Sequence, residues 1–211
     1  MNYLFDMDGV LVYSEPVTKR AAIEVLAEYG IQAKLEDFRP FIGAGEARFV
    51  GGVAEKYGVP YEPAMKDKTY AKYVEYVKEG LTVYPGAKEV LATLKAGGHK
   101  VALCSSADFI KIEANMKGAD IPLDWFDALV CGDDAERKKP FPDIFLAAAR
   151  LLEAEASRCL VIEDAINGIQ AAKAAGMRCA AVTTSFNREQ LTEEAPDFII
   201  DSLNEIPDLA L

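Results

Sequence analysis

Residues 3–11 read YLFDMDGVL, a short apolar run that ends in two carboxylates and a glycine. The apolar run predicts a buried strand, and the glycine predicts that the chain turns soon after it. Asp6 and Asp8 therefore stand at a strand end. In an open sheet of parallel strands the functional crevice lies at the carboxyl ends of the strands, so we expect both acids to lie there.

The spacing of Asp6 and Asp8 leaves their relative direction open. Side chains alternate along extended backbone, so the carboxylates point the same way if the strand continues, whereas Gly9 favours a turn at Asp8. Two carboxylates a few ångströms apart repel by roughly 4 kcal/mol at an effective dielectric constant of about 20. A divalent metal offsets this repulsion, with one carboxylate as ligand and candidate nucleophile and the other placed for proton transfer. The alternative is a solvated link without chemistry.

The composition is that of an ordinary globular protein. The 211 residues are 51% hydrophobic and 27% charged, enough for one sizeable core and a smaller appendage. The formal net charge is −11. Nucleic acid and anionic membrane surfaces attract concentrated positive charge, so we expect neither as a partner. A small anionic substrate is compatible with this charge if a metal and a few local cations reverse the potential at the site.

The cysteines are scattered without a short paired spacing. This pattern favours buried cytosolic thiols over a disulfide framework or a zinc site. No apolar segment approaches the length of a membrane span, and the sequence enters its first strand without a charged leader and cleavage site. We therefore expect a cytoplasmic protein, a monomer or a weak homodimer. The cysteines are Cys104, Cys131, Cys159 and Cys179.

Residues 14–83 predict a helical insertion with no convincing strand. Its helical patterns are 14–30, 46–57 and 64–78. An apolar and aromatic stripe in the last of them is interpreted as packing rather than ligand stacking; it comprises Tyr70, Tyr73, Val74, Tyr76 and Val77. The stretch 41–48 has two glycines before a helix, which either present amides to an anion or only turn the chain. Arg48 is favoured as a solvated surface residue over a clamp for substrate oxygen.

After Pro85 the helical and strand patterns alternate. The predicted strands are 100–104, 128–131, 159–162, 179–183 and 198–200, and the predicted helices are 87–96, 110–117, 143–152 and 165–175. Such alternation predicts an α/β fold, a mostly parallel sheet with helices on both faces. Polar residues follow successive strands: Asp6 and Asp8, then Ser105, then Lys138 and Lys139, then Glu163 and Asp164. Together they supply the groups that phosphoryl transfer needs.

Four stretches in this order resemble the motifs of the haloacid dehalogenase superfamily of phosphotransferases, over essentially the whole chain. They are 6–10, 104–106, 139–145 and 161–165, the last with Gly168, Ala171, Ala172 and Gly176. The insertion resembles the cap of the β-phosphoglucomutase-like branch, which closes over a phosphorylated substrate. The resemblance implies a Rossmann-like α/β core domain, residues 1–13 and 84–211, and a small all-helical cap domain, residues 14–83, inserted after the first strand.

The resemblance implies a role for each matching residue. Asp6 is expected to attack phosphorus, and Asp8 to protonate the leaving oxygen and then activate water. Ser105 is expected to bond a phosphate oxygen and Lys139 to balance charge. Mg²⁺ is the implied cofactor; its expected metal-site residues are Asp6, Asp8 through its backbone carbonyl, Asp164 and the nearby Glu163. Expected substrate contacts are Gly45, Glu46, Arg48, Ser106 and Ala107.

Departures from the family pattern favour hydrolysis. Thr18 stands where β-phosphoglucomutases have a histidine that helps the second aspartate to prefer sugar over water, and Glu46 stands where they have a cap arginine. Lys138 replaces a common glycine, although Pro140 favours Lys139 as the motif lysine. We therefore expect a Mg²⁺-dependent phosphatase of a small phosphorylated metabolite, such as a sugar phosphate. The alternatives are a phosphosugar mutase and a catalytically idle binding or regulatory domain.

Overall fold

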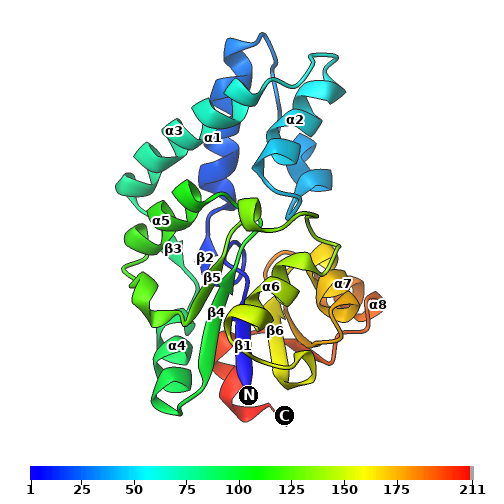
Figure 1. Ribbon diagram of the computed structural model, residues 1–211. Helices are drawn as coiled ribbons and strands as arrows, with labels where there is room; N and C mark the ends of the chain where they lie inside the picture. Colours follow the sequence, from blue (N-terminus) through cyan, green and yellow to red (C-terminus); the bar gives the residue numbers. More distant parts are fainter. Residues whose placement is uncertain (210–211) are drawn as a thin grey trace.

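The computed structural model describes residues 1–209, and its core is a six-stranded parallel sheet (Figure 1). The strand order is β5-β4-β1-β6-β7-β8, and every neighbouring pair is parallel. The strands are β1 (Asn2–Phe5), β4 (Lys100–Cys104), β5 (Ala128–Val130), β6 (Cys159–Glu163), β7 (Arg178–Val182) and β8 (Phe198–Ile200). The predicted α/β fold is confirmed, and the opening strand lies centrally, between β4 and β6.

Helices cover both faces of the sheet because alternate residues of each strand are apolar and point to opposite sides. Tyr3 and Phe5 pack with α4 (Ala87–Ala96), α5 (Phe109–Gly118) and η5 (Leu203–Asp208), whereas Leu4 packs with the helices of the other face. Those helices are α6 (Asp143–Leu151), α7 (Ile166–Ala174) and α8 (Arg188–Glu193). Burial of each large apolar side chain contributes about 1.5–3 kcal/mol, so this two-sided core fixes the strand ends in place.

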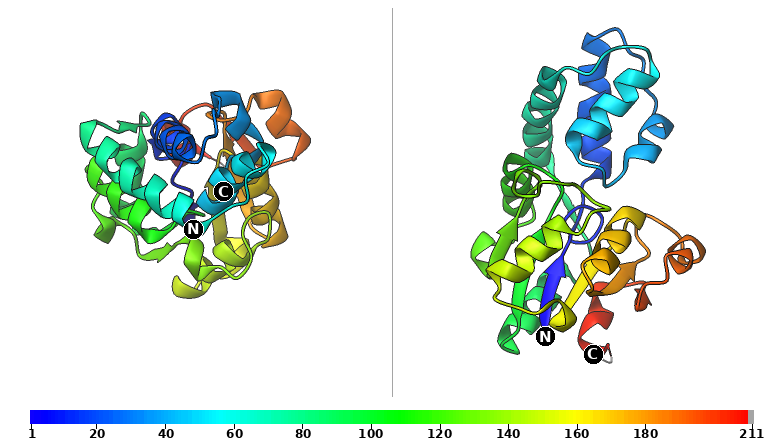
Figure 2. Two further views of the ribbon diagram at one scale, coloured as in Figure 1. Left: turned by 90° about the horizontal axis from the view of Figure 1, so that it is seen from above. Right: turned by 45° about the vertical axis from the view of Figure 1, so that its right-hand side comes forward.

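The insertion forms a separate group of helices above the carboxyl edge of the sheet (Figures 1 and 2). It contains α1 (Glu15–Glu28), η1 (Leu35–Phe41), α2 (Glu46–Lys56) and α3 (Pro63–Glu79). Leu26, Phe38 and Val53 are among the buried residues of its own apolar core. Pro16 stands in the first turn of α1, where a missing amide donor costs nothing, and Gly30 follows the helix at φ +76°.

Two parts of the insertion differ from the sequence prediction. Thr82–Val83 form strand β3, which pairs antiparallel with β2 (Val12–Tyr13), so the prediction that the insertion contains no strand was wrong. A strand of two residues has no alternation of polar and apolar positions to detect. Residues 35–41 also form an unpredicted 3-10 helix that contains Pro40. Three short 3-10 turns complete the fold: η2 (Leu123–Trp125), η3 (Gly132–Asp134) and η4 (Ala156–Arg158).

Burial agrees with the predictions for the aromatic stripe and for the cysteines. Tyr70, Tyr73 and Val77 are buried, as expected for a packing stripe. The four cysteines are buried free thiols. The histidine, His99, is partly buried with its ring edge against Tyr3 at a centroid distance of 5.3 Å. Within residues 1–209, no helix has both the length and the apolar character that crossing a membrane requires.

Candidate active site

A cavity of about 750 Å³, its open mouth included, lies between the carboxyl edge of the sheet and the helical insertion. The structure brings all six core residues expected at the site to its wall: Asp6, Asp8, Ser105, Lys139, Glu163 and Asp164. Four of the five expected substrate contacts also line it: Gly45, Glu46, Ser106 and Ala107. Strand ends that are far apart in sequence therefore converge on one place, as a parallel sheet dictates.

Arg48 is the expected substrate contact that the cavity does not include. Its guanidinium group lies 2.6 Å from the carboxylate of Glu55, and its side chain is 55% exposed. It also lies 5.1 Å from the ring centroid of Phe41, on the outer side of the same helical group. The alternative interpretation of Arg48, a solvated surface arginine, agrees with this position.

The loop after β1 turns at once, so Asp8 lies in this loop and not in a continued strand. Gly9 has φ +84° and donates its amide to the carbonyl of Val12, 2.9 Å away. A side chain at this position would also collide with Asp164, because an added Cβ would lie 1.9 Å from its Oδ2. Glycine thus lets the first loop approach the carboxylate that follows β6.

Lys139 joins two buried carboxylates. Its Nζ lies 2.6 Å from Oδ1 of Asp6 and 2.5 Å from Oε1 of Glu163, and its side chain is 2% exposed. Burial lowers the pKa of Lys139, but the charges of Asp6 and Glu163 outweigh burial and hold it above its usual value. The neighbouring Lys138 instead donates to the carbonyl of Gly132. The register that Pro140 suggested, with Lys139 as the inward lysine, is therefore the one that the fold adopts.

The acids at this end of the cavity carry more negative charge than one lysine balances. Burial, together with the charges of Glu163 and Asp8, raises the pKa of Asp6 to about 7 despite Lys139. Burial and the same kind of repulsion, from Glu163 and Asp6, raise the pKa of Asp164 well above its usual value. The hydroxyl of Ser185 donates to Asp164 and partly offsets that effect. Such a set of repelling carboxylates is a site where a cation is favourable.

Glu163 is held rigidly by its own backbone. Its Oε2 accepts the amide hydrogens of Asp164 and Ala165, each at 2.9 Å. Gly168 on α7 packs against this carboxylate so closely that an added Cβ would lie 1.9 Å from Oε1. Two amides and one glycine therefore fix the orientation that brings Glu163 to Lys139.

The donor set fits a hard divalent cation in its chemistry. Asp6 and Asp164 offer carboxylate oxygens, the ligands that Mg²⁺ prefers. Within residues 1–209, however, no three His, Cys, Asp or Glu side chains are grouped closely enough to form a ready-made metal centre. At the same place, the ammonium group of Lys139 already takes one oxygen from each of Asp6 and Glu163. A cation bound here would share these carboxylates with the lysine.

Ser105 and Ser106 stand directly after β4. The Oγ of Ser105 accepts the amide hydrogen of Ala107 at 3.1 Å, and the residue is 1% exposed. The hydroxyl of Ser106 is buried without a hydrogen-bond partner among the described residues. An unpaired buried hydroxyl is unfavourable, so this loop has capacity for a polar ligand atom.

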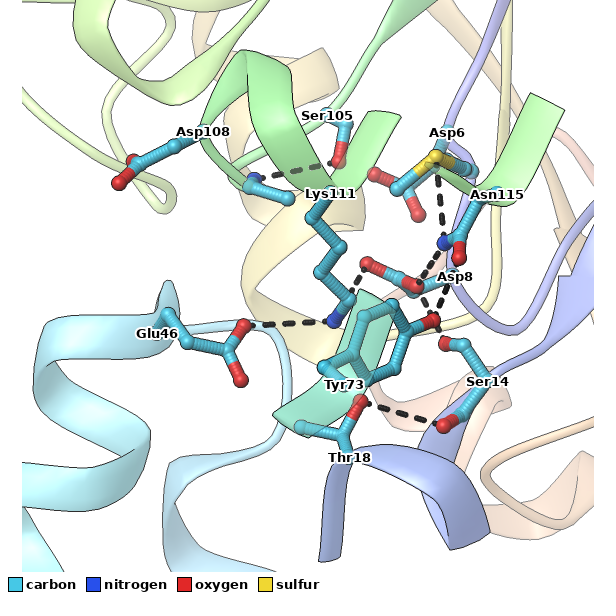
Figure 3. Close-up of polar contacts among 12 residues, drawn as sticks. Asp6, Asp8, Ser14, Thr18, Glu46, Tyr73, Ser105, Asp108, Lys111 and Asn115 are labelled. Carbon is cyan, nitrogen blue, oxygen red and sulfur yellow. Dashed lines mark hydrogen bonds and ion pairs between the residues drawn. The ribbon is translucent and has the colours of Figure 1, made fainter. Parts of the chain in front are cut away.

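Asp8 is held by three side chains that the sequence did not single out for this role (Figure 3). The hydroxyl of Ser14 and the amide of Asn115, at 3.3 Å, donate to its Oδ1. The ammonium group of Lys111 lies 3.2 Å from its Oδ2 and 3.3 Å from Oε2 of Glu46. Behind them, the hydroxyl of Tyr73 donates to Oδ1 of Asn115 at 2.5 Å. The second acid of the opening motif is thus fixed from α1, α3 and α5 together.

Residue type alone is misleading around Lys111. On α5, Phe109 and Ile110 are each 47% exposed, whereas the Lys111 side chain is 6% exposed. Ile112 and Met116 of the same helix are buried, so the exposed pair at its start is the part that apolar character alone would have placed wrongly. The spacing of Lys111 and Asn115 by four residues is the usable signal, because it places both on one face of a helix.

The remaining wall of the cavity is mostly aromatic and apolar. Phe41, Ile42 and Phe49 belong to the insertion, Tyr13 is the last residue of β2, and Tyr84 directly follows β3. Thr18 also lines the cavity, but its hydroxyl donates back to the carbonyl of Ser14 at 3.1 Å. The space beyond the acids can therefore contact a carbon skeleton and its hydroxyl groups.

Comparison with known proteins agrees with this geometry. Protein SUPPRESSOR OF QUENCHING 1, chloroplastic, from Arabidopsis thaliana is 47% identical over 96% of this chain, which spans about a fifth (20%) of that protein. Hexitol phosphatase B from Escherichia coli (strain K12) is 28% identical over 96% of this chain and 92% of its own length. The crystal structure of CbbY from Rhodobacter sphaeroides in complex with phosphate has a TM-score of 0.86 at 26% identity, covering 97% of this chain and 95% of that one.

The sequence profile described as haloacid dehalogenase-like hydrolase matches residues 2–176, which include the ends of β1, β4 and β6 at the cavity but not Ser185, which follows β7. The resemblance inferred from the four motifs is therefore confirmed. The chain belongs to the haloacid dehalogenase-like hydrolase family.

Proposed function

We propose that the protein is a Mg²⁺-dependent phosphatase that hydrolyses a small phosphorylated metabolite, a sugar phosphate, through an aspartyl phosphate on Asp6. The observation that carries the proposal is the convergence of Asp6, Asp8 and Lys139 on one cavity. The carboxylate of Asp6 forms a bond to phosphorus while the bond to the leaving alcohol breaks. Asp8 gives its proton to the alcohol oxygen, then takes a proton from the water that attacks phosphorus and releases inorganic phosphate and free Asp6.

The residues around Asp6 act on the phosphate oxygens. Lys139 offers an ammonium group at the attacking carboxylate, and Ser105 offers a hydroxyl at the end of β4. Asp6, the main-chain carbonyl of Asp8 and Asp164 would hold Mg²⁺, with Glu163 close by. When bound, the metal supplies positive charge for the phosphate oxygens. The raised pKa values of Asp6 and Asp164 support this assignment, because burial and the neighbouring acids disfavour their charged forms, which a bound cation would stabilise.

Two alternative functions can be distinguished from hydrolysis by the experiment described below. A phosphosugar mutase would keep the phosphate and move it, and Thr18, bonded to Ser14, has no imidazole with which to favour sugar over water. An idle binding domain would keep the fold without the chemistry. The firm position of Asp8, held by Ser14, Asn115 and Lys111, argues against the idle domain. The missing imidazole at Thr18 favours hydrolysis over the mutase.

We also propose a domain division, an oligomeric state and a cellular location. We assign residues 14–83 as the cap domain and 1–13 with 84–211 as the core domain. We expect no nucleic-acid or membrane partner, and a monomer or weak homodimer. A cytoplasmic location is supported by the four free thiols.

The test is phosphorus NMR of the purified protein with Mg²⁺ and a panel of phosphorylated sugars and polyols, followed over time. We expect inorganic phosphate to grow, to stop when a chelator is added, and to be absent for Asp6→Asn. A signal that moves to another phosphomonoester without free phosphate would establish a mutase. Full phosphate release by Asp6→Asn would refute the proposed nucleophile, and no turnover of any ester would favour the idle domain.

A further inference from the structure

The cavity has a reacting end and a cap end, and the cap end is defined by one ion pair. Glu46, at the start of α2, and Lys111, on α5, face each other across the space beyond Asp8 (Figure 3). Their side chains are 5% and 6% exposed. Ser105 and Asp6 lie on the other side of Lys111, at the strand ends. A substrate whose phosphate meets Asp6 must therefore direct its far end toward this pair or the apolar wall beside it.

The cavity wall carries more acidic than basic side chains. Among the described residues that line the cavity, the acids are Asp6, Asp8, Glu15, Glu46, Glu163 and Asp164, and the cations are Lys111 and Lys139. Each lysine already contacts two carboxylates: Lys139 those of Asp6 and Glu163, and Lys111 those of Asp8 and Glu46. The described wall therefore has no spare cation at the cap end for a second phosphate.

The same pair has unused hydrogen-bonding capacity for neutral groups. An ammonium group has three donors, and two of those of Lys111 are directed to Asp8 and Glu46. In the described part of the chain Glu46 accepts through Oε2, and its Oε1 has no donor. One hydroxyl of a polyol can donate to Oε1 while another accepts from Lys111, and Phe49 beside them can contact the carbon chain.

We infer that the Glu46–Lys111 pair makes this phosphatase select esters that carry one phosphate and a hydroxylated, uncharged far end, and reject bisphosphates. The inference rests on the proposed function, since it assumes that phosphate is bound at Asp6. A second phosphate would be placed against the carboxylate of Glu46, and the desolvated like charges would repel. Hydroxyl groups meet no such repulsion and pair with both members.

The first experiment compares matched esters on the wild-type protein: glucose 6-phosphate with glucose 1,6-bisphosphate, and fructose 6-phosphate with fructose 1,6-bisphosphate. We expect kcat/KM for phosphate release to be at least about tenfold higher for each monophosphate. Glu46→Gln keeps the shape and an acceptor but removes the charge and frees Lys111. It is expected to shift the ratio at least about tenfold toward the bisphosphate. Glu55→Gln, on the same helix but paired with exposed Arg48, is the matched control and should leave the ratio unchanged.

A binding measurement separates this inference from the proposed function. Calorimetry on Asp6→Asn with Mg²⁺ gives the Kd of each ester without turnover, and the monophosphates are expected to bind at least about tenfold more tightly. Equal binding, tighter binding of the bisphosphates, or no binding of either overturns the inference. So does an unchanged ratio in a Glu46→Gln protein whose unfolding midpoint shows that it is folded. Absence of phosphate release from every ester by the wild-type protein overturns the proposed function instead, whatever the binding preference.

Discussion

The ammonium group of Lys111 lies 3.2 Å from the carboxylate of Asp8, although one residue belongs to α5 and the other to the loop after β1. Burial lowers the pKa of Lys111, but the charges of Asp8 and Glu46 outweigh it and keep the lysine protonated. The contact therefore sets the position of the proposed proton carrier from a helix outside the four motifs.

Replacement of Lys111 by methionine is expected to affect both stability and catalysis. Glu46 would be left buried without a counter-charge, which costs about 3–5 kcal/mol in the free energy of unfolding. Asp8 would lose one of its three contacts, so kcat should fall about 10- to 100-fold. Urea unfolding and steady-state phosphate release measure the two effects.

The double variant Lys111→Met with Glu46→Gln separates these two roles. It should regain part of the lost stability, because no charge is stranded, but not the lost kcat. Lys88→Met is the control, since its ion pair with Asp120 is exposed and is worth less than about 1 kcal/mol. Recovery of kcat in the double variant would show that Lys111 acts through stability alone.

The adjacent lysines 138 and 139 offer a matched pair of variants. Lys139→Met removes the ammonium group that lies 2.6 Å from Asp6, so phosphate release should fall at least about 100-fold. Lys138→Met removes only a bond to the carbonyl of Gly132, and its rate should stay near that of the wild type. Rates are measured at saturating Mg²⁺, with circular dichroism as a check of folding. Similar losses in both variants would contradict the assignment of Lys139.

Gly168→Ala tests the packing of α7 against Glu163. Alanine normally stabilises a helix relative to glycine, by about 0.5–1 kcal/mol. Here the added Cβ would lie 1.9 Å from Oε1 of Glu163, so we expect a net loss of about 1–3 kcal/mol and reduced phosphate release. Gln170→Ala on the same helix loses only an exposed bond to Glu194 and serves as the control. A stabilised, fully active Gly168→Ala protein would show that Glu163 can move freely.

The hydrogen bonds of Asp37 predict that the free energy of unfolding depends on pH through this carboxylate of the insertion. The ammonium group of Lys56, the amide of Lys34 and the hydroxyl of Tyr57 all donate to its carboxylate and hold its pKa well below its usual value. Its stabilisation is full above the pKa of an unfolded aspartate, about 3.9, and is lost as the pH falls through the lower folded-state value. We expect Asp37→Asn to be less stable than the wild type near neutral pH, with a difference that shrinks in acid.

Urea unfolding of both proteins at about pH 7, 4 and 3 measures that difference. The exposed Asp67, changed to asparagine, is the control and should show no such trend. A difference between wild type and Asp37→Asn that is constant over this range would mean that the carboxylate is not stabilised by its three donors.

Much of the fold, and the end of the cavity that holds Asp6 and Lys139, could be predicted from short stretches of sequence. The run before Asp6 is apolar, Gly9 allows the turn, and Pro140 sets the register of Lys139, so each feature is encoded within a few residues. Thr82–Val83 escaped detection because their pairing with Val12–Tyr13 depends on segments distant in sequence.

The cap end of the site was the least predictable part, because it depends on how the insertion sits on the core. Glu46 is an expected substrate contact without an expected partner, and its partner Lys111 lies next to the exposed Phe109 and Ile110 at the start of α5. No sequence pattern around Glu46 or around Lys111 predicts that these two residues contact each other. Such contacts require the three-dimensional arrangement of both groups of helices.

The pairing of β2 with β3 means that the chain enters and leaves the insertion side by side, through a single narrow ribbon. Torsion of that ribbon would swing the helices without disturbing β1, so Asp6 would stay fixed while Glu46 moved away. Lys111, anchored on α5, would then lose one of its two carboxylate partners. Opening would thus leave an ammonium group less neutralised at the moment when an anion has to enter, and closing would neutralise it again.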